Sequence, residues 1–138
     1  MKKKFEILDH KADLVLRIFG KTKKELFENA MLGMFEAARY EKSVDVKHRQ
    51  EKVKVKIKSF DLPSLLVDFL SEILYLVETK KLVFEKINFK KFTETEIEAA
   101  LIGKPLKRMG VHIKGVTYHG LEILRKNDIW QATILFDI

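Results

Sequence analysis

Apolar residues recur with a period of two in several short segments, as expected for strands that bury one face. Between residues 52 and 58, Val53, Val55 and Ile57 alternate with four lysines. Comparable patterns predict further strands at residues 5–8, 13–19, 82–92, 96–102, 113–119, 121–125 and 129–136. Asn127 and Asp128 supply turn residues between the last two strands.

Two other segments have the 3.6-residue period of an α-helix. The first begins after Thr22, where a hydroxyl and, three residues later, the carboxylate of Glu25 form a capping-box pattern, and it runs to about Arg39. Its apolar positions fall on one face: Leu26, Phe27, Ala30, Met31, Met34, Phe35 and Ala38. We interpret this stripe as core rather than as a ligand groove.

The second helix begins at Asp61-Leu62-Pro63, with Asp61 as N-cap and Pro63 in the first turn. Its stripe comprises Leu62, Leu65, Leu66, Phe69, Leu70, Ile73, Leu74 and Val77, widened by Val67, Tyr75 and Leu76. So broad a stripe predicts a central helix covered on more than one side.

The order of elements predicts one α+β domain over residues 1–138, with two main helices packed on a largely antiparallel sheet or sandwich. Helices do not alternate with every strand, which disfavours a doubly wound α/β fold. The sequence contains no repeat, low-complexity segment or Pro/Gly-rich linker that would divide it.

The amino-acid composition excludes several kinds of site. With 46% hydrophobic and 34% charged residues, the 138-residue chain can build a core. It has no cysteine, which excludes disulfides, thiolate catalysis and Cys-ligated zinc within it. The basic N-terminus leads into no apolar stretch typical of a signal peptide, so we expect a cytoplasmic protein.

The net charge of +7 is unevenly distributed. Residues 1–60 carry 16 Lys and Arg against 9 Asp and Glu, whereas residues 61–138 carry 11 of each kind. A basic half suits an anionic partner such as RNA, but a solvated lysine surface explains the same count more simply. The lysine strand lacks the exposed aromatics typical of a dedicated single-strand binder.

Two acidic clusters are candidate sites. Asp9, His10 and Asp13 lie within five residues between the first two strands, where turn and capping roles are the alternative. At the other end, Asp137 adjoins the carboxylate of Ile138. An ordered chain end with two adjacent anions needs compensation. Such oxygen donors favour calcium or magnesium over zinc.

A third cluster spans residues 114–120 and contains Lys114, Thr117, Tyr118 and His119. On a strand, Lys114 and Tyr118 share one face, and Thr117 and His119 share the other, so these groups do not all reach one ligand. A hydrogen-bonded structural role is the simpler interpretation of His119.

These segments, taken in order, resemble the archease family. The resemblance includes the run from Leu8 to Asp13, where the family usually reads D-H-T-A-D, and the terminal Phe136-Asp137-Ile138. It also extends through residues 20–30, 65–70, 103–106 and 114–122. The chain departs from the family at Lys11, which replaces the usual Thr, and in the segment 103–114. That segment is shorter than usual, and His112 is not a clear equivalent of the family's loop histidine.

The resemblance implies a small cytoplasmic α+β protein that assists an RtcB-type tRNA-splicing RNA ligase. Archeases promote guanylylation of the ligase by GTP with metal and so allow multiple turnover, and they are not ligases themselves. The family's metal site maps onto Asp13, Asp137 and Ile138, and its functional lysine onto Lys114. The implied cofactor is a divalent ion, with calcium ahead of magnesium or manganese.

The further candidates for contact with the ligase or nucleotide are Asp9, His10 and His119. Contact with tRNA would be indirect, and we expect neither a membrane nor a DNA partner. The metal could act at the ligase or only fasten the last strand to the loop at Asp13. Two other hypotheses stay open: a general chaperone or modulator of tRNA-modifying enzymes, and a metal-dependent hydrolase using Asp9, His10, Asp13 and Asp137.

Overall fold

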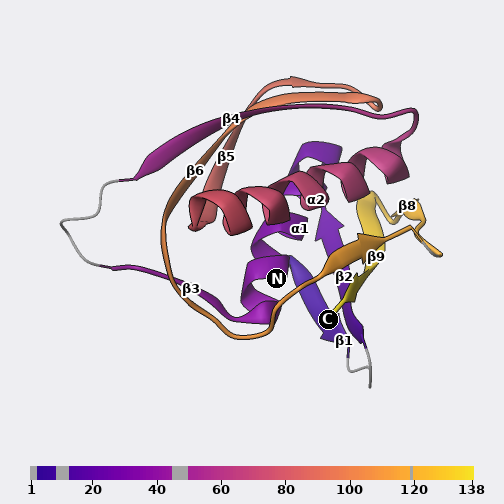
Figure 1. The fold of residues 1–138 in the computed structure, drawn as a ribbon. Coiled ribbons are helices and arrows are strands. Elements are labelled where there is room, and N and C mark those ends of the chain that lie inside the picture. Colours follow the sequence, from indigo (N-terminus) through magenta and orange to yellow (C-terminus); the bar gives the residue numbers. More distant parts are fainter. Residues whose placement is uncertain (1–2, 9–12, 45–49, 119) are drawn as a thin grey trace.

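Two helices lie between two antiparallel sheets in the computed structural model, which describes residues 3–8, 13–44, 50–118 and 120–138 (Figure 1). Each helix packs against strands of both sheets. In the described part of the chain, neither helix combines the length and apolarity needed to cross a bilayer.

The first sheet has β9 at its centre, with β2 along one side and β7 and β8 along the other. β1 completes it beyond β2. Its strands are β1 (Phe5–Leu8), β2 (Asp13–Gly20), β7 (Gly115–Thr117), β8 (Ile123–Lys126) and β9 (Ile129–Asp137). The turn between β8 and β9 places Asn127 and Asp128 at φ 52° and 62°. Two consecutive left-handed residues suit a type I′ hairpin, as the Asn-Asp pair predicts.

The second sheet is built on β6, which is long enough to pair with three strands. These strands are β3 (Tyr40–Lys42), β4 (Glu51–Lys58), β5 (Leu82–Phe92) and β6 (Glu96–Met109). On β4, Val55 and Ile57 are buried and the alternating lysines are exposed, which confirms the predicted two-faced strand.

The helices are α1 (Lys23–Ala38) and α2 (Leu62–Lys80). The Thr22 hydroxyl accepts a hydrogen bond from the Glu25 N–H at 3.1 Å, and an Asp61 carboxylate oxygen accepts one from the Ser64 N–H at 2.8 Å. Both predicted N-caps are therefore confirmed, and hydrogen bonds from the Ser64 side chain and then from its N–H lower the pKa of Asp61.

The core lies in the helical layer between the sheets. The Phe27 ring on α1 is 5.5 Å from Phe69 on α2 and 5.0 Å from Phe92 on β5, centroid to centroid. The predicted Met/Phe stripe of α1 is buried throughout, and α2 is buried on more than one side, as predicted. Tyr75 is the exception on α2, because its side chain is 61% exposed.

The predicted α+β class is confirmed, and three strand predictions need correction. The strand expected at 113–119 is only Gly115–Thr117, and that expected at 96–102 continues through Pro105 to Met109. β3 was not predicted, since three residues directly after a helix are too few to show an alternating pattern.

Candidate functional site

Asp137, at the end of β9, is where three sequence clusters meet. Asp13 on β2 is its register partner on one side, and Gly115 on β7 is its partner on the other. The Lys114 N–H donates a hydrogen bond to the Asp137 carbonyl oxygen at 2.7 Å. The structure therefore brings together Asp13, Lys114 and Asp137 from three parts of the chain.

Strand pairing places the Asp13 and Asp137 side chains on the same face of the sheet. Directly opposed residues of antiparallel strands have Cβ atoms about 4.5–5.5 Å apart, and like charges in such a pair repel. Asp13 is half-buried and Asp137 is exposed. Two carboxylates in this arrangement favour a cation beside them, and oxygen donors fit a hard divalent ion.

Gly115 leaves space on the other side of Asp137. A Cβ atom placed on Gly115 would meet no atom of the described residues beyond its chain neighbours within 4 Å. Because Gly115 is the register partner of Asp137, this space lies on the face that carries the two carboxylates. None of the described residues therefore blocks a cation with its water, or a group from a partner, on this side of Asp137.

Ile138 follows Asp137 directly, and its half-buried side chain packs against the core. This packing holds the last residue of the sequence in place beside the paired aspartates. Ile138, predicted from the sequence as the third ligand residue, is thus anchored next to Asp137.

The segment before β7 is fastened at three successive residues. His112 Nε2 lies 2.6 Å from Glu78 Oε1 on α2, and the Ile113 N–H donates to the Tyr40 hydroxyl at 3.1 Å. Lys114 then bonds to β9 through its main chain, while its side chain is exposed. Burial raises the pKa of Tyr40, so its hydroxyl stays neutral at physiological pH.

A groove of about 380 Å³ runs between α2 and residues 112–115, beside Lys114. Tyr75 and Glu78 line its helix side, and His112 and Lys114 line the other. The prediction that Tyr75 belongs to the apolar core stripe is wrong, because the helix turns this position outward to the groove. Helical periodicity alone does not reveal that an aromatic at the margin of a stripe is exposed.

Tyr118 belongs to a different contact. Its hydroxyl donates to Asp68 Oδ1 on α2 at 2.8 Å, and the Ser59 hydroxyl donates to the other oxygen of the same carboxylate. The bond to Asp68 raises the pKa of Tyr118. The predicted strand would place Tyr118 on the same face as Lys114, but the strand is only Gly115–Thr117 and Tyr118 contacts α2 instead.

Three predicted site residues, Asp9, His10 and His119, lie outside the described residues. Among the residues that are described, no three His, Asp or Glu side chains are grouped as metal ligands. The predicted metal site would not form a group of three acidic or histidine side chains. Only two of its predicted ligands are side chains, those of Asp13 and Asp137, and the third is the main-chain carboxylate predicted at Ile138.

Comparison with known proteins identifies the family to which the chain is similar. The model of the Archease protein family (MTH1598/TM1083) matches residues 5–138. A relative named protein archease from Methanosarcina barkeri is 38% identical, over 99% of this chain and 97% of its own length. Another from Methanothermobacter thermautotrophicus is 32% identical, over 99% of each chain.

Two solved structures share the fold. The solution structure of protein 1598 from Methanobacterium thermoautotrophicum has a TM-score of 0.68 at 27% identity, over 98% of this chain and 99% of that one. The crystal structure of a Thermotoga maritima archease, described as a possible chaperone, has a TM-score of 0.70 at 20% identity. That match covers 100% of this chain and 98% of the other, and it supports the fold alone.

Proposed function

Because the chain belongs to the archease family, we propose that it activates an RtcB-type tRNA-splicing RNA ligase. In this proposal the protein is an accessory factor in the cytoplasm, not itself a ligase. It promotes metal-dependent guanylylation of its partner, so that the ligase turns over repeatedly.

One observation carries the proposal: Asp13 and Asp137 are directly opposed at the edge of an open space, with Lys114 bonded to the same strand end. Asp13, Asp137 and the carboxylate of Ile138 would hold a divalent cation, with calcium favoured and magnesium or manganese as alternatives. The bound ion would supply positive charge where phosphate groups of the ligase's nucleotide must be accommodated.

Lys114 supplies the positive side chain at this edge. Its backbone is fixed by β9 and its neighbours are fixed to Glu78 and Tyr40, while its ammonium group is free to reach outward. We assign to Lys114 the contact with the ligase or with a nucleotide phosphate. The exposed aromatic ring of Tyr75 in the adjoining groove suits an anchor for the same partner surface.

Guanylylation of the partner ligase, with GTP and divalent metal, tests the proposal. Trace wild-type protein should accelerate guanylylation and carry ligation beyond one turnover, and Asp13→Asn should lose this effect by about tenfold or more. Asp128→Asn is the matched control, because Asp128 is an exposed carboxylate on the turn before β9 and asparagine tolerates its positive φ. No acceleration by stoichiometric wild-type protein on a competent ligase would refute the proposal.

The same variant separates a metal that acts at the ligase from a metal that only fastens β9 to β2. The free energy of unfolding is measured with calcium and with chelator, at the temperature of the assay. A folded Asp13→Asn protein that fails to activate supports the site. Loss of activation in proportion to the unfolded fraction supports the fastening role.

The second candidate is a general chaperone, since one protein of the same fold is described as a possible chaperone. A chaperone needs exposed apolar surface, and large exposed apolar side chains occur in the described residues at Ile7, Val44, Phe60, Tyr75, Tyr118 and Leu124. They come from different segments. Suppressed aggregation of an unrelated unfolded protein, unchanged by Asp13→Asn, would favour this candidate.

A further inference from the structure

The outer face of the second sheet carries lysines in register across three strands. Lys52 on β4 is opposite Ile102 on β6, and Lys86 on β5 is opposite the same residue. Two residues further along the strands, Lys54 on β4 and Asn88 on β5 both lie opposite Ala100 on β6. Register partners point to the same side of a sheet, so Lys52, Lys54 and Lys86 form one surface. We call these three residues the lysine triad.

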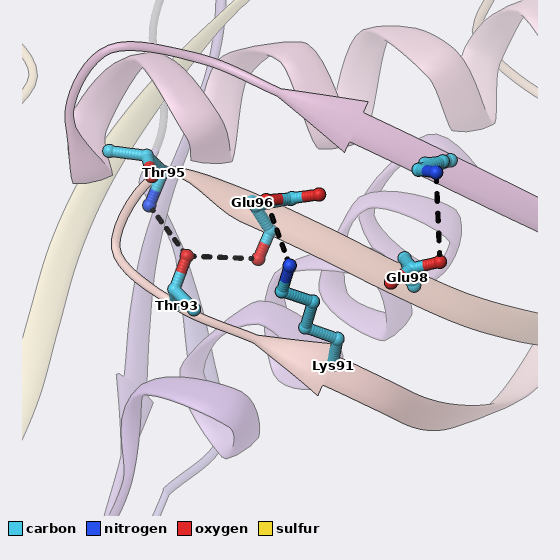
Figure 2. A network of polar contacts seen from close by, with 6 residues as sticks. Lys91, Thr93, Thr95, Glu96 and Glu98 are labelled. Carbon is cyan, nitrogen blue, oxygen red and sulfur yellow. Dashed lines mark hydrogen bonds and ion pairs between the residues drawn. The ribbon is translucent and has the colours of Figure 1, made fainter.

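The adjacent part of this face is different, because glutamates lie between its lysines (Figure 2). The Lys91 ammonium is 3.0 Å from Glu96 Oε2, and the Lys56 ammonium is 3.9 Å from Glu98 Oε1. The bond from Lys91, with the charges of nearby lysines, lowers the pKa of Glu96. The acidic side chains therefore neutralise one end of the face only.

Within the described chain, no member of the lysine triad has an ion-pair partner. Ile102 and Ala100, which occupy the β6 positions between them, carry no charge. A shallow groove of about 450 Å³ on this face is lined by Lys52, Lys54 and Lys90, and also by Lys56 and Glu98, which form an ion pair. The lysines of this groove outnumber its glutamate, and the excess positive charge attracts a polyanion.

The spacing suits a phosphate backbone. Alternate residues of a strand lie about 6.7 Å apart, and strands two apart in a sheet lie about 9.6 Å apart. Lys52 and Lys54 thus present ammonium groups at a separation comparable with that of successive phosphates on one strand. Exposed aromatics for base stacking do not accompany the triad on its strands, so this surface contacts phosphates rather than bases.

We propose that the lysine triad binds the phosphate backbone of RNA without reading its base sequence. The choice of RNA among polyanions rests on the proposed function, because the partner ligase acts on RNA. The surface itself is distinct from the Asp13–Asp137 edge, which belongs to the other sheet. A protein that assists the ligase could in this way also hold its RNA substrate nearby.

Fluorescence anisotropy with a labelled RNA stem-loop, without ligase, tests the proposal between 50 and 200 mM KCl. The triple variant Lys52→Gln, Lys54→Gln, Lys86→Gln should weaken binding about tenfold or more and reduce the slope of log K against log salt by about 2–3. The triple arginine variant at the same positions should bind as the wild type does. All three side chains are exposed, so both variants should keep the wild-type melting temperature.

A second triple variant removes the same charge elsewhere, at the exposed Lys24, Lys80 and Lys126. An equal loss of RNA affinity in this control would overturn the proposal, since net charge alone would then explain binding. Tighter association with phosphatidylserine vesicles or with polyglutamate than with RNA would overturn it as well. So would the absence of RNA binding by the wild type at 50 mM KCl.

The guanylylation assay with GTP distinguishes the RNA-binding proposal from the proposed activation of the ligase. The lysine-triad variant should accelerate guanylylation of the ligase as the wild type does, because that step needs no RNA. Failure of RNA binding with intact activation refutes the RNA surface alone. Failure of activation with intact RNA binding refutes the proposed function alone.

Discussion

At the scale of single residues, Asp137 is defined by its two lateral neighbours. One is another aspartate, Asp13, and the other is Gly115, which has no side chain. A strand interior disfavours glycine, because it packs nothing and costs conformational entropy. Here φ is not positive and no atom of the described residues blocks a side chain, so neither backbone conformation nor crowding among them requires glycine. We predict that the role of Gly115 is to keep Asp137 accessible.

Gly115→Arg tests that role. The new guanidinium would lie opposite Asp137 and form a cross-strand ion pair with its carboxylate, in the place of a cation. We expect the free energy of unfolding to change by no more than about 0.5 kcal/mol. Activation of guanylylation should fall about tenfold or more. Chemical denaturation and the guanylylation assay measure the two effects.

Gly115→Ala is the control for this substitution. A methyl group would meet none of the described side chains or backbone within 4 Å, so both stability and activation should remain at wild-type levels. If alanine abolished activation as arginine does, the space would be needed for close backbone approach rather than for access to the carboxylate.

At the scale of elements, the sequence predicts what local chemistry determines. Thr22 and Asp61 mark the helix starts because a hydroxyl or carboxylate caps free N–H groups within three residues. The site is less predictable, since the pairing of Asp13 with Asp137 depends on the register of strands more than a hundred residues apart. From the residues alone the clusters could be identified as acidic, and the family resemblance grouped Asp13 with Asp137, but neither predicted the main-chain bond from Lys114 to Asp137.

β3 shows what pattern reasoning missed. Tyr40 is buried on this short strand, and its hydroxyl accepts the bond from the Ile113 N–H that fixes the residue next to Lys114. Tyr40→Phe keeps the ring and leaves that buried N–H without its partner. We expect a loss of about 1–2 kcal/mol in the free energy of unfolding.

The loss should also be local. Amide hydrogen exchange at Ile113 should accelerate in Tyr40→Phe beyond the change in global stability, because the segment next to Lys114 is released. Tyr75→Phe is the matched control, since it removes the hydroxyl of an exposed tyrosine. Equal exchange rates at Ile113 in both variants would show that the Tyr40 bond does not fix this segment.

β3 is also joined to β5 by an ion pair. Glu85, whose side chain is 17% exposed, accepts hydrogen bonds from Lys42 and, at 2.8 Å, from Gln50. The hydrogen bond from Lys42 is the main cause that lowers the pKa of Glu85. Burial acts in the opposite direction, and the bond from Gln50 lowers the pKa further. A lowered pKa in the folded state adds stability above the unfolded pKa, and this is lost as pH falls through the folded value.

Glu85→Gln should therefore be less stable than the wild type at pH 7, by about 1 kcal/mol. The difference should begin to shrink as the pH falls through about 4.3, the ordinary pKa of glutamate, and should be smallest once the pH is also below the lowered pKa of the folded state. Urea denaturation across this range measures it. The exposed Glu122→Gln variant should show no such dependence, and a gap for Glu85→Gln that persisted in acid would contradict the ionic origin.

At the scale of the whole molecule, the helical layer joins two sheets that carry different charged surfaces. The first sheet carries the paired aspartates at the end of β9, and the second carries the lysine triad on its outer face. Composition indicated the basic half of the chain. It did not indicate which lysines lack acidic neighbours, because that depends on which β6 residues lie between β4 and β5.

The aromatic contacts in this layer predict that the sheets unfold together. Phe27 is fully buried on α1, and its ring contacts Phe69 on α2 and Phe92 on β5. Phe27→Ala removes both contacts and leaves a cavity, so the expected loss is about 3–5 kcal/mol of unfolding free energy. Since the same ring lies against elements that contact both sheets, near-UV and far-UV circular dichroism should report one coincident transition at lower denaturant.

Phe60→Ala provides the comparison, because this phenylalanine is 85% exposed and its removal should change stability by no more than about 0.5 kcal/mol. If Phe27→Ala instead gave two separate transitions, the helical layer would belong mainly to one sheet. The paired aspartates Asp13 and Asp137 and the lysine triad would then belong to parts of the fold that unfold with different free energies. A single transition would mean that a metal binding at Asp13 and Asp137, as proposed, also stabilises the sheet that carries the lysines, through one folding equilibrium.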